Sequence, residues 1–288
     1  MTDSRHSYVD LHLHSVYSDG SFTPGEIVSD AEKKGLSALI LTDHDTTEGT
    51  SLMLKACAQA GIRTIPGIEI SCTWKDKSIH ILGYGMDYRN GHFQKQLAEW
   101  QGDRERRNRA ITEKLRKGGY DISMKQLHAH FPGAILTRAH IAVYMAEKQM
   151  VPDKNAVFSS LIGKGCPYYV PRKPIPPGDA VRFLLSHGGV PVFAHPILTR
   201  MTPEMLDSFT GYLAELGLKG MEGYYSGYTV EDEALVAEIA AKYGLILTGG
   251  SDFHGTAKPS ISIGTGKGGL RVPFSCYESL ISMTGNRS

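Results

Sequence analysis

Short apolar runs of strand length alternate with longer segments of helical periodicity along most of the chain. In the first part, the pattern predicts strands at residues 8–13, 36–42, 63–70 and 78–84, with helices at residues 23–34 and 50–60. In the last part, it predicts helices at residues 177–187, 202–216 and 229–243, alternating with strands at residues 190–194, 220–224 and 245–249. Because strands separated by helices usually pair in parallel, the order predicts a barrel-like α/β fold with parallel strands.

Turn and capping residues support these boundaries. Thr23 is a candidate N-cap, Pro24 occupies the first turn, and Glu26 completes a capping box at the start of the first predicted helix. Gly35 and Gly61 follow the first two predicted helices, where glycine commonly ends a helix. The elements are therefore bounded by recognised start and stop signals as well as by hydrophobic periodicity.

The middle of the chain has a different pattern. Helical periodicity continues without a strand signal until a short β-type run at residues 167–170, and a proline-rich stretch follows at residues 171–177. The helices are expected at residues 93–117, 123–130, 138–148 and 155–162. We therefore predict a helical insertion at residues 95–175 that caps a single barrel domain formed by residues 1–94 and 176–288.

Composition favours a globular protein of a reducing compartment. The chain has 288 residues, 41% hydrophobic and 21% charged, which is enough apolar material for one large core. Its four cysteines form no CxxC pair, and no apolar run is long enough for a membrane span or a secretory signal. We expect a cytoplasmic protein with neither a membrane association nor an obligate protein partner.

The net charge of +1 conceals an uneven distribution. Residues 95–175 contain fifteen lysines and arginines against seven aspartates and glutamates, so the remaining chain is acidic overall. A basic segment beside an acidic, histidine-bearing body suits an anionic substrate held next to bound cations. The alternative for the basic run at residues 104–109 is a solvated helix face.

Histidines and carboxylates gather where the predicted strands end. His12 and His14 are two positions apart at the end of the first strand, so both side chains point to the same face. Others follow or end later strands, which is the active-site edge of parallel α/β barrels. The complete set is His12, His14, Asp19, His44, Glu69, His80, His195, Asp252 and His254.

This set of side chains predicts a site for several metal ions. Imidazole and carboxylate ligands suit zinc, manganese and iron, so the ligand types do not distinguish among these three metals. Six histidines and three carboxylates exceed the needs of one ion, so two or three divalent ions are expected. Glu69 is the candidate for a carboxylate that bridges two of them.

The sequence resembles the PHP family, named for polymerase and histidinol phosphatase domains. The motifs that carry the resemblance are DLHLHSVYSDG at residues 10–20, LTDHD at 41–45, PGIE at 66–69, IHILGY at 79–84, AHP at 194–196 and GSDFHG at 250–255. The resemblance implies a distorted (β/α)7 barrel with a trinuclear site. It would place His12, His14, Glu69 and Asp252 around one ion, Glu69, His80 and His195 around a second, and Asp19, His44 and His254 around the third.

Two motifs of the insertion narrow the resemblance. TRAHIA at residues 137–142 and GKGCPYYVP at 163–171 are similar to those of a bacterial PHP subgroup that acts on nucleotides. That subgroup includes 3′,5′-nucleoside bisphosphate phosphatases and exonucleases that trim RNA from a 5′-phosphate end. The resemblance implies hydrolysis of such a nucleotide to a 5′-nucleotide and phosphate, or of short 5′-phosphorylated RNA.

The expected reaction is attack of a metal-bound hydroxide on phosphorus, in line with the leaving oxygen. We expect Glu69 and His195 to take part in catalysis together with Arg138 and His140. Arg138 is expected to grip a phosphate, and His140 to contact the phosphate or assist the leaving group. The alternatives are a surface charge for Arg138 and a helix-packing histidine for His140. For Lys164 and Arg172, contacts to a second phosphate or to the sugar are the functional interpretation, and surface charge is the alternative.

Three other functions remain open at this stage. Histidinol phosphate is another possible substrate for a phosphatase of this kind, and related metal barrels hydrolyse amides or esters. A non-catalytic module that binds nucleic acid is the alternative outside the enzymes, with binding that weakens in salt. The sequence leaves open the identity and occupancy of the metals, the choice between mononucleotide and oligonucleotide, the acid that protonates the leaving group, and the oligomeric state.

Overall fold

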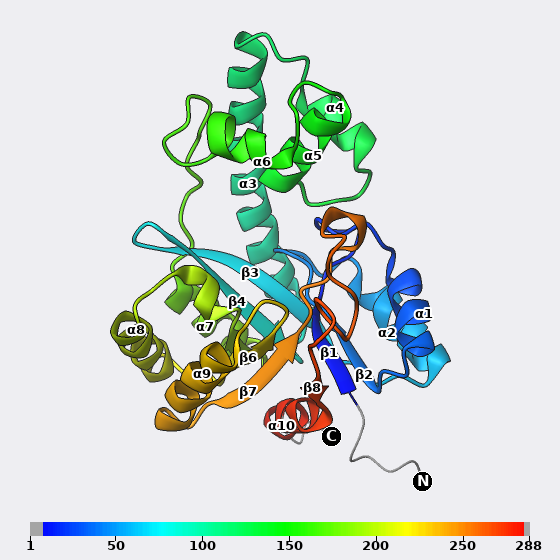
Figure 1. Cartoon of the computed structure of the whole chain (residues 1–288), viewed down its shortest axis with the longest axis vertical. Helices are drawn as coiled ribbons and strands as arrows, with labels where there is room; N and C mark the ends of the chain where they lie inside the picture. Colours follow the sequence, from blue (N-terminus) through cyan, green and yellow to red (C-terminus); the bar gives the residue numbers. More distant parts are fainter. Residues whose placement is uncertain (1–7, 285–288) are drawn as a thin grey trace.

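The computed structural model describes residues 8–284, and its strands form two sheets with helices packed around them (Figure 1). The smaller sheet has the order β2 (Ala38–Leu41), β1 (Tyr8–Leu13) and β8 (Val272–Pro273). β1 pairs in parallel with β2 and antiparallel with β8. The predicted first strand is therefore confirmed, whereas β8 was not anticipated.

The larger sheet has five strands. Its order is β3 (Gly67–Trp74), β4 (Lys77–Tyr84), β5 (Val190–Phe193), β6 (Gly220–Tyr225) and β7 (Ile246–Gly250). The pairs β5–β6 and β6–β7 are parallel. β4 is antiparallel to both of its neighbours, so the expectation of parallel strands is wrong there.

The reason lies in the connection between β3 and β4. Only Lys75 and Asp76 separate the two strands, and a two-residue connection joins antiparallel strands, whereas a parallel pair needs a crossover of a dozen or more residues. Lys75 has a φ of 53°, which is the left-handed conformation common in such tight hairpins. No helix separates β3 from β4, so the alternation of strands and helices that predicted parallel pairing is interrupted at this hairpin.

Single bridges join the edges of the two sheets. Leu13 pairs in parallel with Phe253, just after β7, and His44 pairs in parallel with Glu69 in β3. Among residues 8–284, the strands thus form two sheets linked by isolated bridges, not one continuously hydrogen-bonded barrel. Both bridges contain or adjoin residues of the predicted metal site, so the sheet edges bring that site together.

Helices cover the outer faces of the sheets. α1 (Pro24–Lys33) and α2 (Thr50–Ala60) pack over the smaller sheet, where Ile27, Leu39 and Met53 are buried in one apolar cluster. The capping box of Thr23 and Glu26 is present. Helices α7 (Pro177–Ser186), α8 (Pro203–Glu215), α9 (Val230–Lys242) and α10 (Phe274–Met283) accompany the larger sheet, although α10 was not anticipated.

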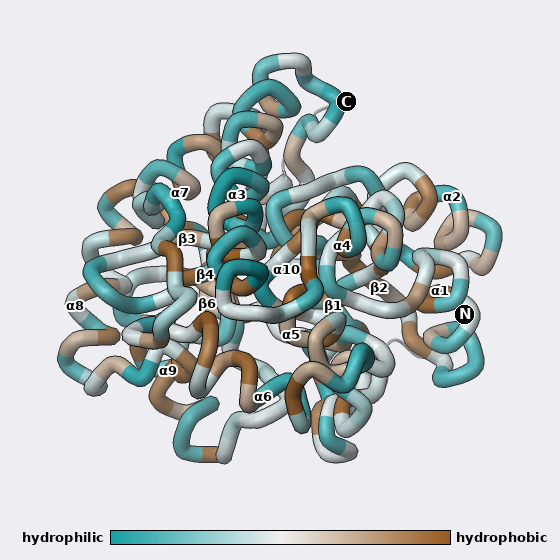
Figure 2. Tube along the Cα trace, turned by 90° about the horizontal axis from the view of Figure 1, so that it is seen from above, coloured by the Kyte–Doolittle hydropathy of each residue, from teal (hydrophilic) through white to brown (hydrophobic). Residues whose placement is uncertain are grey.

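The middle of the chain forms a group of helices above the sheets (Figure 1). These are α3 (Gly91–Lys117), α4 (Met124–His130), α5 (Arg138–Glu147), α6 (Lys154–Val157) and a π-helix at Phe158–Ile162. Phe93 and Leu97 of α3 belong to the core of the larger sheet, whereas Ile111 and Leu115 belong to a separate apolar cluster of the helical group. α3 thus connects two cores, and Figure 2 shows mainly hydrophilic residues along its outer face.

The β-type run at residues 167–170 does not form a strand. The backbone N–H of Tyr168 donates to the carbonyl of Leu161 at 2.9 Å, and its ring packs edge-on against Tyr120 at 5.9 Å. The aromatic pattern of this run therefore reflects packing against helices. No helix among residues 8–284 is both long enough and apolar enough to cross a bilayer.

Candidate metal centre and active site

All nine predicted ligands lie together where the two sheets meet. His12 lies near the end of β1 and His14 directly follows that strand; both side chains are fully buried, and Asp19 lies in the loop that comes next. The remaining six come from β2, β3, β4, β5 and β7 or from the residues directly after them. These six are His44, Glu69, His80, His195, Asp252 and His254.

Glu69 lies at the centre of the cluster. Its Oε2 is 3.4 Å from His12 Nε2, 3.2 Å from His14 Nε2 and 2.9 Å from His44 Nδ1. These three histidines come from two different strands and their following loops. One carboxylate oxygen therefore faces three imidazole nitrogens in a fully buried position.

The second oxygen of Glu69 faces another pair of histidines. Glu69 Oε1 is 2.7 Å from His80 Nδ1 and 3.0 Å from His195 Nε2. The carboxylate thus lies between two sets of imidazoles, one on each oxygen. This is the arrangement of a carboxylate that bridges two cations.

Asp19 and Asp252 complete the cluster on the side away from His80. Asp252 Oδ1 is 3.2 Å from His14 Nε2 and 3.7 Å from His12 Nε2. Asp19 Oδ1 is 3.3 Å from His254 Nε2 and 3.8 Å from His44 Nε2. Four groups of at least three ligand atoms lie within 4.8 Å of one another: His14, Asp19, His44 and His254; His12, Glu69 and His195; His12, His14 and Asp252; and His44, Glu69 and His80.

The hydrogen bonding of these atoms fits bound cations. Asp19 Oδ1, His44 Nδ1 and Glu69 Oε2 are buried and have no hydrogen-bond partner. His44 Nδ1 approaches Glu69 Oε2 to 2.9 Å without the geometry of a hydrogen bond. Buried polar atoms without partners are costly, and converging lone pairs are satisfied by a cation that lies between them.

The carboxylates and histidines shift one another's pKa in opposite directions. Burial alone would raise the pKa of Glu69, but His44, His80 and His12 hold it well below its usual range. Burial lowers the pKa of His14, but hydrogen bonds and charges from Asp252 and Glu69 outweigh it and raise that pKa to about 9. The cluster is therefore strongly anionic in its deprotonated form and attracts either protons or metal cations.

Glu222 contacts the cluster and was not among the residues predicted from the sequence. It is fully buried in β6, where its Oε1 lies 2.9 Å from His12 Nδ1 and its Oε2 accepts the backbone N–H of His195 at 2.7 Å. A carboxylate on one ring nitrogen fixes the tautomer that leaves the other nitrogen free for a metal. The available signal was a lone glutamate within the otherwise uncharged strand Gly220–Tyr225.

Replacing Glu222 by glutamine should lower metal affinity by about 10–100-fold, because His12 and His195 lose the carboxylate that orients them. Chelator competition at fixed pH measures the affinity. Glu238→Gln, on the exposed face of α9, is the matched control and should bind metal like the wild type. If a folded Glu222→Gln protein binds metal as tightly as the wild type, Glu222 does not orient His12 and His195 for metal binding.

Asp10 and Asp43 hold the loops that carry the ligands. Asp10 accepts backbone N–H groups from Ser251 at 2.8 Å and Gly264 at 2.7 Å, and burial raises its pKa to about 6. Asp43 accepts from the backbone N–H of Ser15 at 2.7 Å and from the Ser18 hydroxyl at 2.5 Å. These two carboxylates therefore position the loops after β1 and β7 without contacting the centre of the site.

Two of the ligands have an unusual backbone conformation. His195 has a φ of 28° and Asp252 a φ of 55°, in the left-handed region that side chains other than glycine seldom adopt. Asp45, next to His44, has a φ of 55° as well. The backbone turns sharply after β5 and β7, and the turns direct these side chains toward the cluster.

A basic cavity of about 570 Å³ opens onto the ligand cluster. Its lining includes Asp19, His44 and His80 from the cluster, and Arg104, Arg107, Arg138, Lys164 and Arg172 from the helical group and the return segment. Three of the four predicted substrate residues, Arg138, Lys164 and Arg172, thus line one cavity. Arg107 lines it too and was not predicted.

The arginines of this cavity differ in their charge partners. Arg172 donates to Asp45 at 2.9 Å, and Arg104 contacts the same carboxylate. Among residues 8–284, no carboxylate oxygen lies within 4.0 Å of the guanidinium of Arg107 or Arg138. Burial, followed by repulsion from neighbouring arginines, lowers the pKa of Arg107, so an anion in the cavity would relieve an unfavourable charge.

His140 has a structural environment. Its Nδ1 accepts the backbone N–H of Thr137 at 2.8 Å and completes the capping box of α5. The side chain is buried, and burial lowers its pKa to about 4. His140 is therefore neutral at physiological pH and accepts a hydrogen bond from the backbone of its own helix start.

The depressed pKa of His140 predicts an acid-dependent loss of stability. Because unfolded histidine binds a proton near pH 6.5 and folded His140 only near pH 4, this group stabilises the fold above pH 6.5 and loses about 3 kcal/mol as pH falls to 4. Urea unfolding of metal-depleted wild type and His140→Asn across this range measures the difference. A difference in unfolding free energy that stays constant with pH would refute the assignment.

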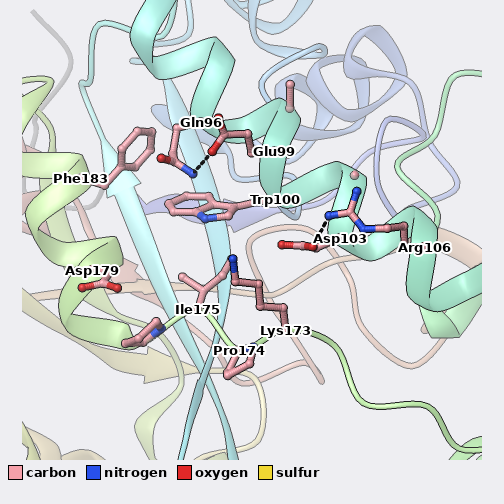
Figure 3. Close-up of a pocket in the computed structure, with 13 residues that line it drawn as sticks. Gln96, Glu99, Trp100, Asp103, Arg106, Lys173, Pro174, Ile175, Asp179 and Phe183 are labelled. Carbon is pink, nitrogen blue, oxygen red and sulfur yellow. Dashed lines mark hydrogen bonds and ion pairs between the residues drawn. The ribbon is translucent and has the colours of Figure 1, made fainter.

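A separate cavity of about 570 Å³ lies between α3 and α7 (Figure 3). Trp100, Asp103, Lys173 and Phe183 contribute to its lining, with the Trp100 ring edge-on to Phe183 at 4.9 Å. None of the nine clustered residues lines it. This cavity is therefore not part of the site described above.

Comparison with known proteins places the chain among enzymes that act on phosphate esters. The PHP domain family model matches residues 10–159. A 5′-3′ exoribonuclease of Haemophilus influenzae is 32% identical, with 85% of this chain and 89% of that protein aligned. A 3′,5′-nucleoside bisphosphate phosphatase of Chromobacterium violaceum is 30% identical over 89% of this chain and 90% of that protein.

Two further proteins extend the comparison. A phosphoribosyl 1,2-cyclic phosphate 1,2-diphosphodiesterase of Eggerthella lenta is 31% identical, with 85% of this chain and 94% of that protein aligned. A crystal structure from Bifidobacterium adolescentis, assigned as a metal-dependent phosphoesterase, superposes with a TM-score of 0.86 at 27% identity over 99% of both chains. With its fold and its cluster of metal-ligand types, the chain therefore belongs to the PHP domain family and is a metal-dependent phosphoric ester hydrolase.

Proposed function

We propose that the chain cleaves the P–O3′ bond of nucleotides that also carry a 5′-phosphate. The observation that supports this most directly is the basic cavity beside the ligand cluster, where Arg107 and Arg138 have no carboxylate partner within the described part of the chain, residues 8–284. A substrate with two phosphates could place one phosphate in this cavity and the other at the ligand cluster. In a nucleotide with 3′- and 5′-phosphates, one nucleoside separates the two groups. One relative is named for 3′,5′-nucleoside bisphosphates, and another is named a 5′-3′ exoribonuclease.

Three divalent cations, of manganese, zinc or iron, are proposed for the cluster. His12, His14, Glu69 and Asp252 would hold one. The second would lie among Glu69, His80 and His195, and the third among Asp19, His44 and His254. When bound, such cations neutralise phosphate oxygens and acidify a coordinated water.

The protein's own residues then orient the substrate. Arg138 lies between the rings of Phe158, 5.9 Å from its guanidinium carbon, and Tyr169, at 6.0 Å, which limit its motion. A planar guanidinium held in this way suits bidentate contact with a 5′-phosphate. Lys164 lines the same cavity but is largely exposed, so its contribution is long-range attraction of the anion.

The architecture proposed for this function is a distorted barrel with a cap. The bridges Leu13–Phe253 and His44–Glu69 link the two sheets, which supports the barrel, and residues 95–175 are proposed as the cap that carries the arginines. Cys57, Cys72, Cys166 and Cys276 are all unpaired, which supports a cytoplasmic location.

Phosphate release from a substrate panel with manganese present tests the proposal. The panel contains adenosine 3′,5′-bisphosphate, adenosine 3′-monophosphate, a 5′-phosphorylated RNA and histidinol phosphate. The bisphosphate should be preferred to the 3′-monophosphate by at least about 10-fold, because only the bisphosphate gains the charge-assisted contacts of the basic cavity. Equal rates on the two nucleotides, or a preference for histidinol phosphate, would overturn it.

A further inference from the structure

The cavity between α3 and α7 shares a wall with the basic cavity. Lys173, Pro174 and Ile175, from the segment that returns from the helical group (residues 171–177), line both cavities. Ile175 is buried, and its carbonyl accepts the backbone N–H of Thr73 in β3 at 2.9 Å, which fixes this wall to the larger sheet. Ligands in the two cavities would therefore lie on opposite sides of the same short stretch of chain.

Aromatic and aliphatic side chains form the apolar part of the cavity between α3 and α7. Trp100 of α3 lies edge-on to Phe183 of α7 at 4.9 Å, and Ile175 lies across the cavity from Trp100 (Figure 3). The volume of about 570 Å³ is in the usual range of about 300–1,000 Å³ for cavities that bind small molecules. This part of the cavity suits a ligand with an aromatic or aliphatic body.

The carboxylates of this cavity already have partners. Asp103 contacts the guanidinium of Arg106, and Asp179 accepts from Arg182 at 2.5 Å. Glu99 is exposed and accepts a side-chain amide at 3.3 Å. Because like charges brought close together repel, three carboxylates around one cavity disfavour a ligand with two or more negative charges.

Lys173 is in a different situation. Among residues 8–284, no carboxylate oxygen lies within 4.0 Å of its Nζ. Its side chain extends from the returning segment toward Trp100 (Figure 3). A lysine without a carboxylate partner forms a charge-assisted hydrogen bond with one carboxylate group of a ligand. One such cation beside an apolar wall matches an organic anion that carries a single negative charge.

We propose that the cavity between α3 and α7 binds an organic monocarboxylate with an apolar body, and that the bound carboxylate weakens anion binding in the basic cavity. Lys173 lines both cavities, so a carboxylate that neutralises its charge on one side removes positive charge from the other. The effect on catalysis rests on the function proposed above, whereas the binding of the monocarboxylate does not.

The fluorescence of Trp100 reports binding directly. Trp74 lines neither of the two cavities, so a Trp74→Phe protein keeps a single tryptophan, in the wall of the proposed site. In metal-depleted protein, 3-phenylpropionate should change this fluorescence and bind at least about 10-fold more tightly than 3-phenylpropionamide, which has the same body without the charge. Lys173→Met should abolish this difference, and the matched control Lys95→Met, on an exposed position of α3, should retain it.

The effect on catalysis is measured with metals present. Saturating 3-phenylpropionate should raise KM for adenosine 3′,5′-bisphosphate by about 3-fold, a small factor because Lys173 is exposed and its charge is screened. The rise should reach a plateau and leave kcat unchanged, because the two ligands occupy different cavities. Lys173→Met should itself raise KM by a similar factor, and the carboxylate should then raise it no further.

Three results would show that the inference is wrong. They are a Trp100 fluorescence that does not respond to 3-phenylpropionate, an amide that binds as tightly as the carboxylate, and a KM that either stays constant or rises without a plateau. A KM that rises equally in Lys173→Met would also overturn it, because the carboxylate would then act elsewhere. A protein that binds 3-phenylpropionate as expected but does not hydrolyse the bisphosphate would instead overturn the function proposed above.

Discussion

Replacing Glu69 by glutamine will lower kcat/KM by at least about 10³-fold, since the charge stabilisation supplied by bound metal ions amounts to several kcal/mol in the transition state. The carboxylate faces five histidines through its two oxygens. A glutamine of the same size cannot bridge two cations through both of its terminal atoms. The metal content after purification should fall together with the activity.

The control and the readouts separate loss of metal from loss of fold. Glu48→Gln removes an exposed glutamate close to His44 in sequence and should retain both metal and activity. Elemental analysis gives the metal content, and circular dichroism with thermal unfolding reports the fold. Wild-type metal content and activity in Glu69→Gln would show that the cluster is not the catalytic metal site.

The second large effect is expected in stability. Asp45→Asn should lower the free energy of unfolding by about 3–5 kcal/mol, because it breaks a buried ion pair by removing only the anion. Asp45 is buried, contacts Arg104 and Arg172, and accepts the backbone N–H of Ser71 at 2.8 Å. Its carboxylate thus joins the loop after β2, helix α3, strand β3 and the segment that returns from the helical group.

Asparagine is the informative replacement at this position. Asp45 has a φ of 55°, which asparagine tolerates well, so the backbone is not an additional source of instability. The unfolding of metal-depleted protein in urea gives the change without a contribution from bound ions. Asp207→Asn, which removes an exposed partner of Lys242, serves as the control and should change little. An Asp45→Asn protein as stable as this control would mean that the three-residue network contributes nothing to the fold.

The clustering of the nine residues could be predicted from the sequence because most of them lie at the end of a strand or follow it, whereas Glu69 and His80 lie inside β3 and β4. Period-two burial placed His12 and His14 on one face, and the strands at Val190–Phe193 and Ile246–Gly250 begin and end within one residue of their predicted positions. A residue that directly follows a buried strand has few possible locations, since the strand direction determines where it emerges. For these residues, the local sequence pattern is therefore enough to predict where in the fold the side chain lies.

The remaining parts of the site depend on long-range contacts. Glu222 acts on His12 across 210 positions of the chain, and no periodicity in β6 indicates which distant ring it will meet. Asp45 and Arg172 are 127 positions apart, and their pairing follows from the way the helical group returns to the sheets. The strand β4 was predicted, but its direction was wrong, because the rhythm of strands and helices does not show that only two residues connect it to β3.

The left-handed backbone at His195 and Asp252 has an evolutionary consequence. Each such residue costs on the order of 1–3 kcal/mol, which glycine would avoid, but glycine has no side chain with which to coordinate an ion. A selection for thermal stability that does not also require catalytic activity would therefore favour glycine at these two positions. Replacing either residue by glycine should raise the free energy of unfolding of the metal-depleted protein and remove one of the candidate ligands.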